Sequence, residues 1–382
     1  MPHLDGVRSG EYTPEDDRAT EATRQDHPVK ATLKSIAREA GVTPMVVWAV
    51  AHDDYTRVRV SEQRRKQVRG LLEKHNYVPD ATARSLANRT TRLINLFVPS
   101  MRFFEVPFQQ QMMAGLQDSL ASGGYRISFS FFRNQSGAED VAQDVIADAG
   151  LFFYYGSGND PALKRVRDLP MPLLVFGRCD DEDVSAVYRD NYTGMSSLVR
   201  RIVKAGHNDI LLVSSFLGDN HNSDGRRGVL DAVAQSGIES FDELRLAAPA
   251  HRAGPDALQL HELGRDAAKR VLKRKRRPTA AVFLSDTIAL AAMKEFQERG
   301  VGIPDELSVA ANGTDVGASF VTPRLTRATC DAYAAGAKCA QALLQLVRAS
   351  RKSRPSRTAL PMKVAWGDSV AAPGRDTSSA GR

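Results

Sequence analysis

Short apolar runs alternate with longer amphipathic segments from residue 92 onward, and this alternation restricts the fold more than any other feature of the sequence. The apolar runs predict strands; they lie at 93–98, 125–132, 151–155, 173–176, 210–214, 281–285 and 307–311. Helix-like segments lie at 112–122, 196–205, 225–236, 287–300 and 334–348. Strands that alternate with helices indicate an α/β fold of parallel sheets covered by helices on both faces. We expect two such units, divided near Asp190, which would form two Rossmann-like lobes with a cleft between them.

The region before residue 79 has a different pattern, that of short helices. Thr32 and Ser35 can cap a first helix, and Gly41 can end it in a left-handed conformation. Thr43 can cap a second helix that begins at Pro44, where the missing N–H of proline costs nothing. Two short helices joined by a turn with glycine indicate a helix-turn-helix. We call this small all-α unit the headpiece.

The second helix of the headpiece has an unusually apolar sequence. Val47 and Val50 lie three residues apart and should face inward. The residues expected to face outward are Pro44, Met45, Trp48, Ala49 and His52. A third helix is expected over 61–75, with several arginines and lysines on its outer face.

The excess positive charge of the chain lies in and just after the headpiece. Residues 28–92 hold thirteen Lys and Arg against six Asp and Glu, and the remainder of the chain is balanced. Clustered positive charge is typical of a module that binds nucleic-acid phosphates. A solvated basic face is the alternative interpretation.

Three stretches of this region resemble the LacI/GalR family of transcription regulators. Residues 31–43 are similar to the family's first helix and turn, 58–80 to its third helix and exit, and 81–90 to its hinge. The resemblance implies that the hinge becomes helical on operator DNA, with Leu86 inserted into the minor groove beside Ala83. Such an apolar wedge unstacks a base step and bends the duplex. The alternative is that Leu86 is an ordinary linker residue.

The resemblance and the helix pattern together give a set of candidate DNA-binding residues. They are Thr32, Leu33, Lys34, Thr43, Pro44, Met45, Trp48, Ala49, His52, Arg59, Ser61, Arg64, Tyr77, Ala83 and Leu86. The second helix departs from the family, because Trp48 and Ala49 stand where the family has a Ser-Arg pair. Ala49 cannot bind guanine as arginine does, although its methyl group could touch a thymine methyl. Either the base preference is altered, or this helix has drifted and binds DNA weakly or with a partner surface.

A weaker resemblance to the same family continues through the rest of the chain. It covers 106–115, 190–194, 205–207, 285–286 and 322–326, so that the similarity as a whole spans about residues 30 to 370. It implies a periplasmic-binding-protein-like core that binds a small-molecule effector, a sugar or a derivative among the candidates. The candidate effector-binding residues are Phe108, Asp190, Arg226 and Asp286.

The expected effector cleft keeps only part of the family's pattern. Asp286 corresponds to an aspartate that accepts hydrogen bonds from ligand hydroxyls, at the end of a strand where such folds bind ligands. The alternative is that Asp286 caps the helix that follows it. The usual arginine would fall at Gly225, so a guanidinium is available only if Arg226 turns inward.

The sequence therefore predicts a homodimeric regulator, most often a repressor in this family, that binds a palindromic operator and responds to an effector. A cytoplasmic solute sensor whose headpiece has lost or altered its DNA reading is the second hypothesis. An enzyme is not expected, because the Gly-Lys-Ser/Thr, Gly-x-Ser-x-Gly and His-Glu-x-x-His patterns are missing; neither a cofactor nor a metal is predicted.

The expected organisation is a disordered acidic tail at 1–27, the headpiece at 28–78, a hinge at 79–91, the core at 92–370 and a disordered tail at 371–382. No apolar stretch approaches the roughly 18 to 20 residues that span a bilayer. The first residues also lack the pattern of a secretory signal. We expect a cytoplasmic protein.

Overall fold

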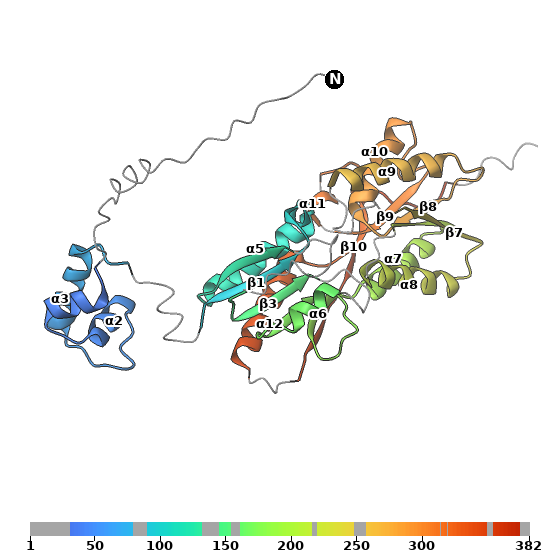
Figure 1. The fold of residues 1–382 in the computed structure, drawn as a ribbon. Coiled ribbons are helices and arrows are strands. Elements are labelled where there is room, and N and C mark those ends of the chain that lie inside the picture. The colour runs from blue at the N-terminus through green and yellow to red at the C-terminus, as the bar shows by residue number, and fades with distance from the viewer. Residues whose placement is uncertain are drawn as a thin grey trace, which may run out of the picture. The chain divides into compact units, whose positions relative to one another are not determined.

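The computed structural model describes residues 31–78, 90–131, 145–153, 161–215, 220–247, 257–313, 315–318, 320–349 and 354–374. The chain divides into two compact units, Met1–Asn88 and Arg89–Arg382 (Figure 1). The described parts of these units are the headpiece, residues 31–78, and the core, residues 90–374. The predicted N-terminal tail and residues 79–89 of the predicted hinge lie outside the described residues.

The headpiece consists of α1 (Leu33–Ala40), α2 (Pro44–His52) and α3 (Glu62–Lys74). Thr32 caps α1, and its hydroxyl accepts a hydrogen bond from the backbone N–H of Ser35 at 3.2 Å. Gly41 ends α1 with φ = 62°, a left-handed conformation that glycine adopts without strain. The helices enclose a small apolar core in which Ile36, Val47 and Val68 are fully buried. The predicted helix-turn-helix is therefore confirmed.

The first lobe of the core contains a sheet of six strands in the order β11-β5-β4-β3-β1-β2. The strands are β1 (Leu93–Val98), β2 (Arg126–Phe131), β3 (Ala149–Phe153), β4 (Leu173–Phe176), β5 (Ser185–Arg189) and β11 (Arg357–Leu360). All five strand pairs are parallel. One face packs against α5 (Pro107–Ser122) and α12 (Ala332–Arg348), and the other against α6 (Pro161–Arg167). A short 3-10 helix, η2 (Met101–Glu105), leads into α5.

Helices α5 and α12 cross at two glycines. A Cβ on Gly115 would lie 2.0 Å from the carbonyl oxygen of Tyr333, and one on Gly336 would lie 1.9 Å from that of Met112. Any larger side chain at these positions would push the two backbones apart. The crossing therefore depends on glycine at both positions.

The second lobe repeats the arrangement, with the strand order β12-β10-β9-β8-β6-β7. Its strands are β6 (Asp209–Ser215), β7 (Ser240–Leu246), β8 (Ala280–Phe283), β9 (Ser308–Asn312), β10 (Thr326–Thr329) and β12 (Lys363–Ala365). Only the β10–β12 pair is antiparallel. Helices α7 (Asn191–Lys204) and α8 (Asn220–Ala234) pack on one face, and α9 (Ala257–Leu272) and α10 (Asp286–Glu298) on the other. A single turn of helix, α11 (Asp315–Ala318), follows β9.

The chain passes between the two lobes three times, between β5 and α7, between β10 and α12, and between β11 and β12. The predicted division near Asp190 is the first of these crossings. The other two bring α12 and β11 back to the first lobe, and β12 back to the second. Each lobe is therefore built from separate stretches of the chain.

The structure also fixes where the core begins. The carboxylate of Asp148 accepts hydrogen bonds from the hydroxyl of Thr90, from the N–H and hydroxyl of Thr91 at 2.7 and 2.8 Å, and from the N–H of Arg92 at 3.1 Å. Burial alone would raise the pKa of Asp148, but these hydrogen bonds outweigh it and lower the pKa. The core therefore begins at Thr90, within the segment that the sequence assigns to the hinge.

At the other end, Ala371 belongs to the core and not to a tail. Its carbonyl oxygen accepts a hydrogen bond from Nε2 of His207 at 2.8 Å, and its N–H donates to Ser308 at 3.2 Å. This corrects the predicted start of the C-terminal tail, because residues 371–374 pack against the second lobe; residues 375–382 lie outside the described part of the chain. Within the described residues, no helix combines the length and the apolar character that crossing a membrane requires.

Candidate functional site

Five basic side chains of the headpiece are exposed and form neither an ion pair nor a side-chain hydrogen bond with any described residue. They are Lys34 and Arg38 on α1, Arg57 and Arg59 in the loop before α3, and Lys66 on α3. Unpaired, exposed guanidinium and ammonium groups can bind phosphates without first giving up a carboxylate partner. Lys34 and Arg59 are among the residues expected to contact DNA.

Two carboxylates of the headpiece, those of Glu39 and Asp53, pair with other bases. Glu39 lies 2.8 Å from the ammonium group of Lys74 and 2.6 Å from Nε2 of His75, and Asp53 lies 2.8 Å from the guanidinium of Arg69. The hydrogen bond from Lys74, followed by that from His75, holds the pKa of Glu39 below its usual value. Lys74 and Arg69 are thus partly neutralised, in contrast to the five unpaired bases.

The outer face of α2 is apolar, as the sequence predicts. Met45 is 46% exposed, and Pro44 beside it is exposed as well. The half-buried rings of Trp48 and His52 stack with their centroids 4.7 Å apart and their planes 25° from parallel. Nδ1 of His52 lies 2.8 Å from the carbonyl oxygen of Trp48 and must donate to it, since a carbonyl only accepts.

Ala49 does not belong to this outer face. It is 0% exposed, and the prediction that it faces outward is wrong. The helical periodicity explains the error: at 100° per residue, Ala49 lies at the edge of the arc that Val46, Val47 and Val50 bury against the other helices. The residues of α2 that reach the surface are therefore Pro44, Met45, Trp48 and His52.

The other DNA-binding candidates occupy helix ends and the basic loop. Thr32 and Ser61 cap α1 and α3, and Thr43 caps α2 without a side-chain hydrogen bond. The guanidinium of Arg64 donates to the carbonyl oxygen of Ala40 at 3.3 Å, so it is partly used to close the end of α1. Leu33 and Tyr77 are half-buried and pack against the headpiece core. Ala83 and Leu86 lie outside the described residues.

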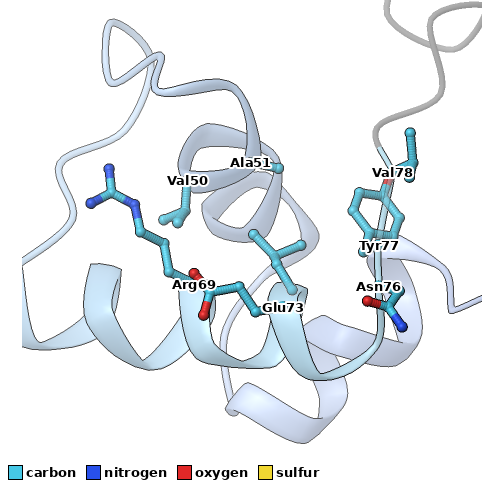
Figure 2. A pocket seen from close by; sticks show the side chains of 8 residues that line it. Val50, Ala51, Arg69, Glu73, Asn76, Tyr77 and Val78 are labelled. Atoms are coloured by element: carbon cyan, nitrogen blue, oxygen red, sulfur yellow. The ribbon is translucent and has the colours of Figure 1, made fainter.

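A pocket of about 430 Å³ lies where the chain leaves the headpiece. Figure 2 shows its lining: Val50 and Ala51 from α2, Arg69 and Glu73 from α3, and Asn76, Tyr77 and Val78 from the segment that follows. These residues come from the C-terminal ends of α2 and α3, so the pocket lies at the opposite end of α2 from Pro44. The sequence patterns predict no such pocket.

The candidate effector residues of the first lobe lie beside the first crossing between the lobes. Phe108 of α5 is buried and stacks against Phe176 at the end of β4, with ring centroids 5.9 Å apart. The guanidinium of Arg189, the last residue of β5, lies 4.4 Å from the centre of the Phe108 ring. The next residue, Asp190, caps α7 by accepting a hydrogen bond from the N–H of Thr193 at 3.1 Å.

Asp286 is the first residue of α10, and Ser285 caps that helix. The alternative expectation, that Asp286 is itself the cap, is therefore off by one residue. Its carboxylate accepts the N–H of Thr287 at 2.8 Å, and a negative charge in the first turn interacts favourably with the helix dipole. A Cβ on Gly313 would lie 2.6 Å from Oδ2 of Asp286, so the glycine makes room for this carboxylate.

A buried pair of amides lies next to Asp286. The side-chain nitrogen of Asn312, at the end of β9, donates to the side-chain oxygen of Asn191 at 3.2 Å. The other amide atom of Asn312, Oδ1, is buried without a hydrogen-bond partner among the described residues. A Cβ on Gly225 would lie 3.8 Å from Cβ of Asn191, so this glycine borders the same place. Asn312 is not among the residues predicted from the sequence, although a polar residue that ends an apolar strand is a usable signal.

The described contacts of Arg226 are with Glu243 and not with Asp286. Its guanidinium binds the carboxylate of Glu243 on β7 with two hydrogen bonds of 2.8 and 2.7 Å. This ion pair, with further hydrogen bonds from Ser214 and Arg245, lowers the pKa of Glu243 to about 2. The expectation that Arg226 turns toward the effector is therefore corrected: it is a partner of Glu243 within the second lobe.

Among the residues that the structure describes, one ion pair joins the two lobes. Arg178, which follows β4, lies 3.1 Å from the carboxylate of Asp224 on α8. Asp224 is buried and also binds Arg227 at 3.2 Å. Phe108, Asp190 and Asp286, together with the amides of Asn191 and Asn312, thus lie along the side of the core where the first crossing and this ion pair connect the lobes.

The chain is similar to known transcription regulators. Residues 199–370 match a family described as a periplasmic binding protein-like domain. The chain is 26% identical over 302 residues to the HTH-type transcriptional repressor PurR of Serratia proteamaculans (strain 568), which covers 78% of this chain and 84% of that protein. It is 23% identical to catabolite control protein A of Priestia megaterium over 314 residues; this match covers 81% of this chain and 90% of that protein.

Two solved structures resemble this chain over about nine tenths of its length. A lac repressor dimer bound to operator and the anti-inducer ONPF has a TM-score of 0.75 at 21% identity, covering 90% of this chain and 99% of that one. A cellobiose complex of the transcriptional regulator CelR has a TM-score of 0.63 at 22% identity, covering 89% and 99%. These likenesses confirm the predicted fold, a small all-α headpiece with a periplasmic-binding-protein-like core of two Rossmann-like lobes.

Proposed function

We propose that the chain is a transcription regulator of the LacI/GalR family, which binds operator DNA through its headpiece and a small-molecule effector through its core. The observation that carries the proposal is the helix-turn-helix with five exposed bases that form no ion pair with a described carboxylate. A regulator of this kind is most often a repressor, and PurR, to which the chain is similar, is named as one. Such a protein would act in the cytoplasm.

We propose the same division of labour along the chain as the sequence indicates. The headpiece would occupy a half-site, residues 79–89 would connect it to the core as a hinge, and Leu86 would enter the minor groove. A second copy would bind the other half-site, because a two-fold dimer matches a palindromic operator. The lac repressor structure that resembles this chain is described as a dimer bound to operator.

The effector would bind on the side of the core where Phe108, Asp190 and Asp286 lie. Asp286 supplies a carboxylate and Asn312 an unpaired amide oxygen, both of which accept hydrogen bonds. An effector that donates hydrogen bonds, such as a polyhydroxylated molecule, suits these acceptors. By binding the two lobes in one arrangement better than in another, the effector would change the affinity for DNA. We infer that the core binds the effector and does not catalyse a reaction on it.

The test is to incubate the full-length protein with genomic fragments and to sequence the bound DNA. We expect enrichment of a palindromic motif whose affinity exceeds that of unrelated DNA by about 10³-fold or more and falls steeply with salt. Lys34→Ala should weaken binding and reduce the salt slope by about one charge, because Lys34 is unpaired. Lys74→Ala is the matched control and should do less, because Lys74 is bound to Glu39.

A solute sensor that no longer reads DNA is the competing function, and the apolar α2 favours it. The two functions differ in one measurement. A protein lacking residues 1–89 should lose its affinity for the enriched fragments if the headpiece reads DNA. Equal binding by the truncated and full-length proteins, or no enriched motif at all, would show that the regulator assignment is wrong.

A further inference from the structure

Helix α2 carries almost no group that can hydrogen-bond to a base. Its nine residues are Pro-Met-Val-Val-Trp-Ala-Val-Ala-His, without a charged, amide or hydroxyl side chain before His52. His52 offers nothing to a base edge either, because Nδ1 is bonded to the carbonyl of Trp48 and Nε2 is buried. The indole N–H of Trp48 is the remaining donor on the helix.

What α2 presents instead is an apolar surface with a fixed shape. Met45 is the most exposed part of it, and the stack of Trp48 on His52 holds the indole ring in place. The exposed, unpaired bases Lys34, Arg38 and Arg59 belong to the same small unit, so this surface is presented by a module with the charge to bind phosphates. Charge complementarity therefore favours DNA as the partner of this surface.

The major groove offers one apolar group, the methyl on C5 of thymine, and 5-methylcytosine carries the same group. Guanine offers acceptors at the edge, adenine an acceptor and a donor, and cytosine a donor. Placing any of these against Met45 would remove water from a polar group without replacing its hydrogen bond, which is unfavourable. A methyl group has no hydrogen bond to lose, and its transfer from water to an apolar contact is favourable.

We propose that α2 selects DNA by the 5-methyl groups of pyrimidines, through Met45 and Trp48. The inference rests on the proposed function, because it concerns how the headpiece reads an operator. It also replaces the expectation that Ala49 touches the methyl, since Ala49 is buried. The matching prediction is an operator half-site in which a 5-methylpyrimidine stands opposite α2.

The experiment starts from the motif that the full-length protein enriches. Each thymine of a half-site is replaced in turn by deoxyuridine, which removes only the methyl and keeps every hydrogen-bonding group. We expect one or two positions at which the affinity falls about fourfold, the loss that corresponds to one buried methyl group. Thymines elsewhere in the duplex should tolerate the change.

Variants show which side chain makes the contact. Met45→Ala should bring the thymine-to-uracil affinity ratio at one position close to one, and Met45→Leu should keep most of it. Met101→Ala is the matched control, because Met101 is an exposed methionine of the core, and it should leave the ratio unchanged. Trp48→Phe should alter the ratio at a neighbouring position; far-ultraviolet circular dichroism of each variant shows that the helices remain.

Two further duplexes separate the sources of the methyl group. At the sensitive position, thymine is replaced by cytosine and by 5-methylcytosine. Tighter binding of the methylated duplex would assign recognition to the methyl on either base, and equal binding would assign it to thymine alone. Failure of the protein to enrich any motif would overturn the proposed function. An enriched motif that tolerates uracil at every thymine would overturn this inference and leave the regulator assignment standing.

Discussion

Replacing Asp148 tests how the core holds its first residues. One carboxylate there accepts two hydroxyl and two backbone N–H hydrogen bonds from Thr90, Thr91 and Arg92. Asp148→Ala removes all of them and leaves both backbone donors without their partner. At about 1 kcal/mol for each N–H and somewhat more for bonds to a charged acceptor, we expect the free energy of unfolding to fall by about 3 kcal/mol.

Asp148→Asn should be milder. The amide keeps one oxygen, which can still accept from Thr91, but its NH₂ group cannot accept from the N–H of Arg92. We expect a loss of about 1 to 2 kcal/mol. The control is Asp118→Ala, because the exposed Asp118 accepts a single side-chain hydrogen bond, from Tyr333, and its loss should cost less than about 1 kcal/mol.

The pH dependence gives a second, independent readout. The folded-state pKa of Asp148 is lowered, so the carboxylate stabilises the fold above its ordinary pKa of 3.8, and this contribution disappears as the pH falls below that value. Urea unfolding at pH 7 and at about pH 2.5 should show the wild type and Asp148→Asn converging on acidification, because only below 3.8 is the carboxylate of Asp148 protonated in both states. Variants that unfold within about 0.5 kcal/mol of the wild type at pH 7 would refute the argument.

Four further predictions concern other parts of the molecule. Burial lowers the pKa of His207, so the unfolded chain takes up a proton first as the pH falls below about 6.5; His207→Gln should flatten the loss of stability between pH 7.5 and 5.5 in urea unfolding. Arg226→Ala leaves Glu243 with only Ser214 and Arg245, and should cost about 2 kcal/mol in the same assay. Gly41→Ala meets no atom within 4 Å but has φ = 62°, so thermal unfolding of the headpiece should show a loss of about 1 kcal/mol from backbone strain alone. Leu86→Ala should weaken binding to the enriched motif more than binding to unrelated DNA; an equal loss on both would make Leu86 a linker residue.

The strands whose bounds could be predicted from the sequence are those with continuous apolar runs. Strands β1 and β4 begin and end as predicted, because both faces of each are buried and almost every side chain is apolar. The sequence pattern did not indicate β7, because its sequence Ser-Phe-Asp-Glu-Leu-Arg-Leu mixes charged and apolar residues at the edge of the second sheet. The pattern likewise did not indicate β10 and β12, which pair with each other and are only four and three residues long. Their pairing depends on neighbours far away in the chain.

The errors at the candidate site have a similar origin. Whether Ala49 reaches the surface depends on how α2 rotates against α1 and α3, and an alanine fits either environment. Arg226 could be expected to face a ligand only as long as its partner on β7 was unknown. Local features such as the capping of α1 and the left-handed Gly41 were predictable, because they depend on residues a few positions apart.

The three passages of the chain between the lobes determine the order in which the protein can fold as it is made. When synthesis has reached residue 330, five strands of the first sheet exist, but α12 and β11 do not. The side of that sheet shared by α5 and α12 is then half uncovered, with Leu96, Leu151 and Leu174 on it. The second lobe, from α7 to β10, is by then nearly whole and lacks β12 and the residues up to 374 that pack against it. The lobe made first is therefore completed late, and a nascent chain that stalls before α12 is made leaves this apolar surface exposed to solvent.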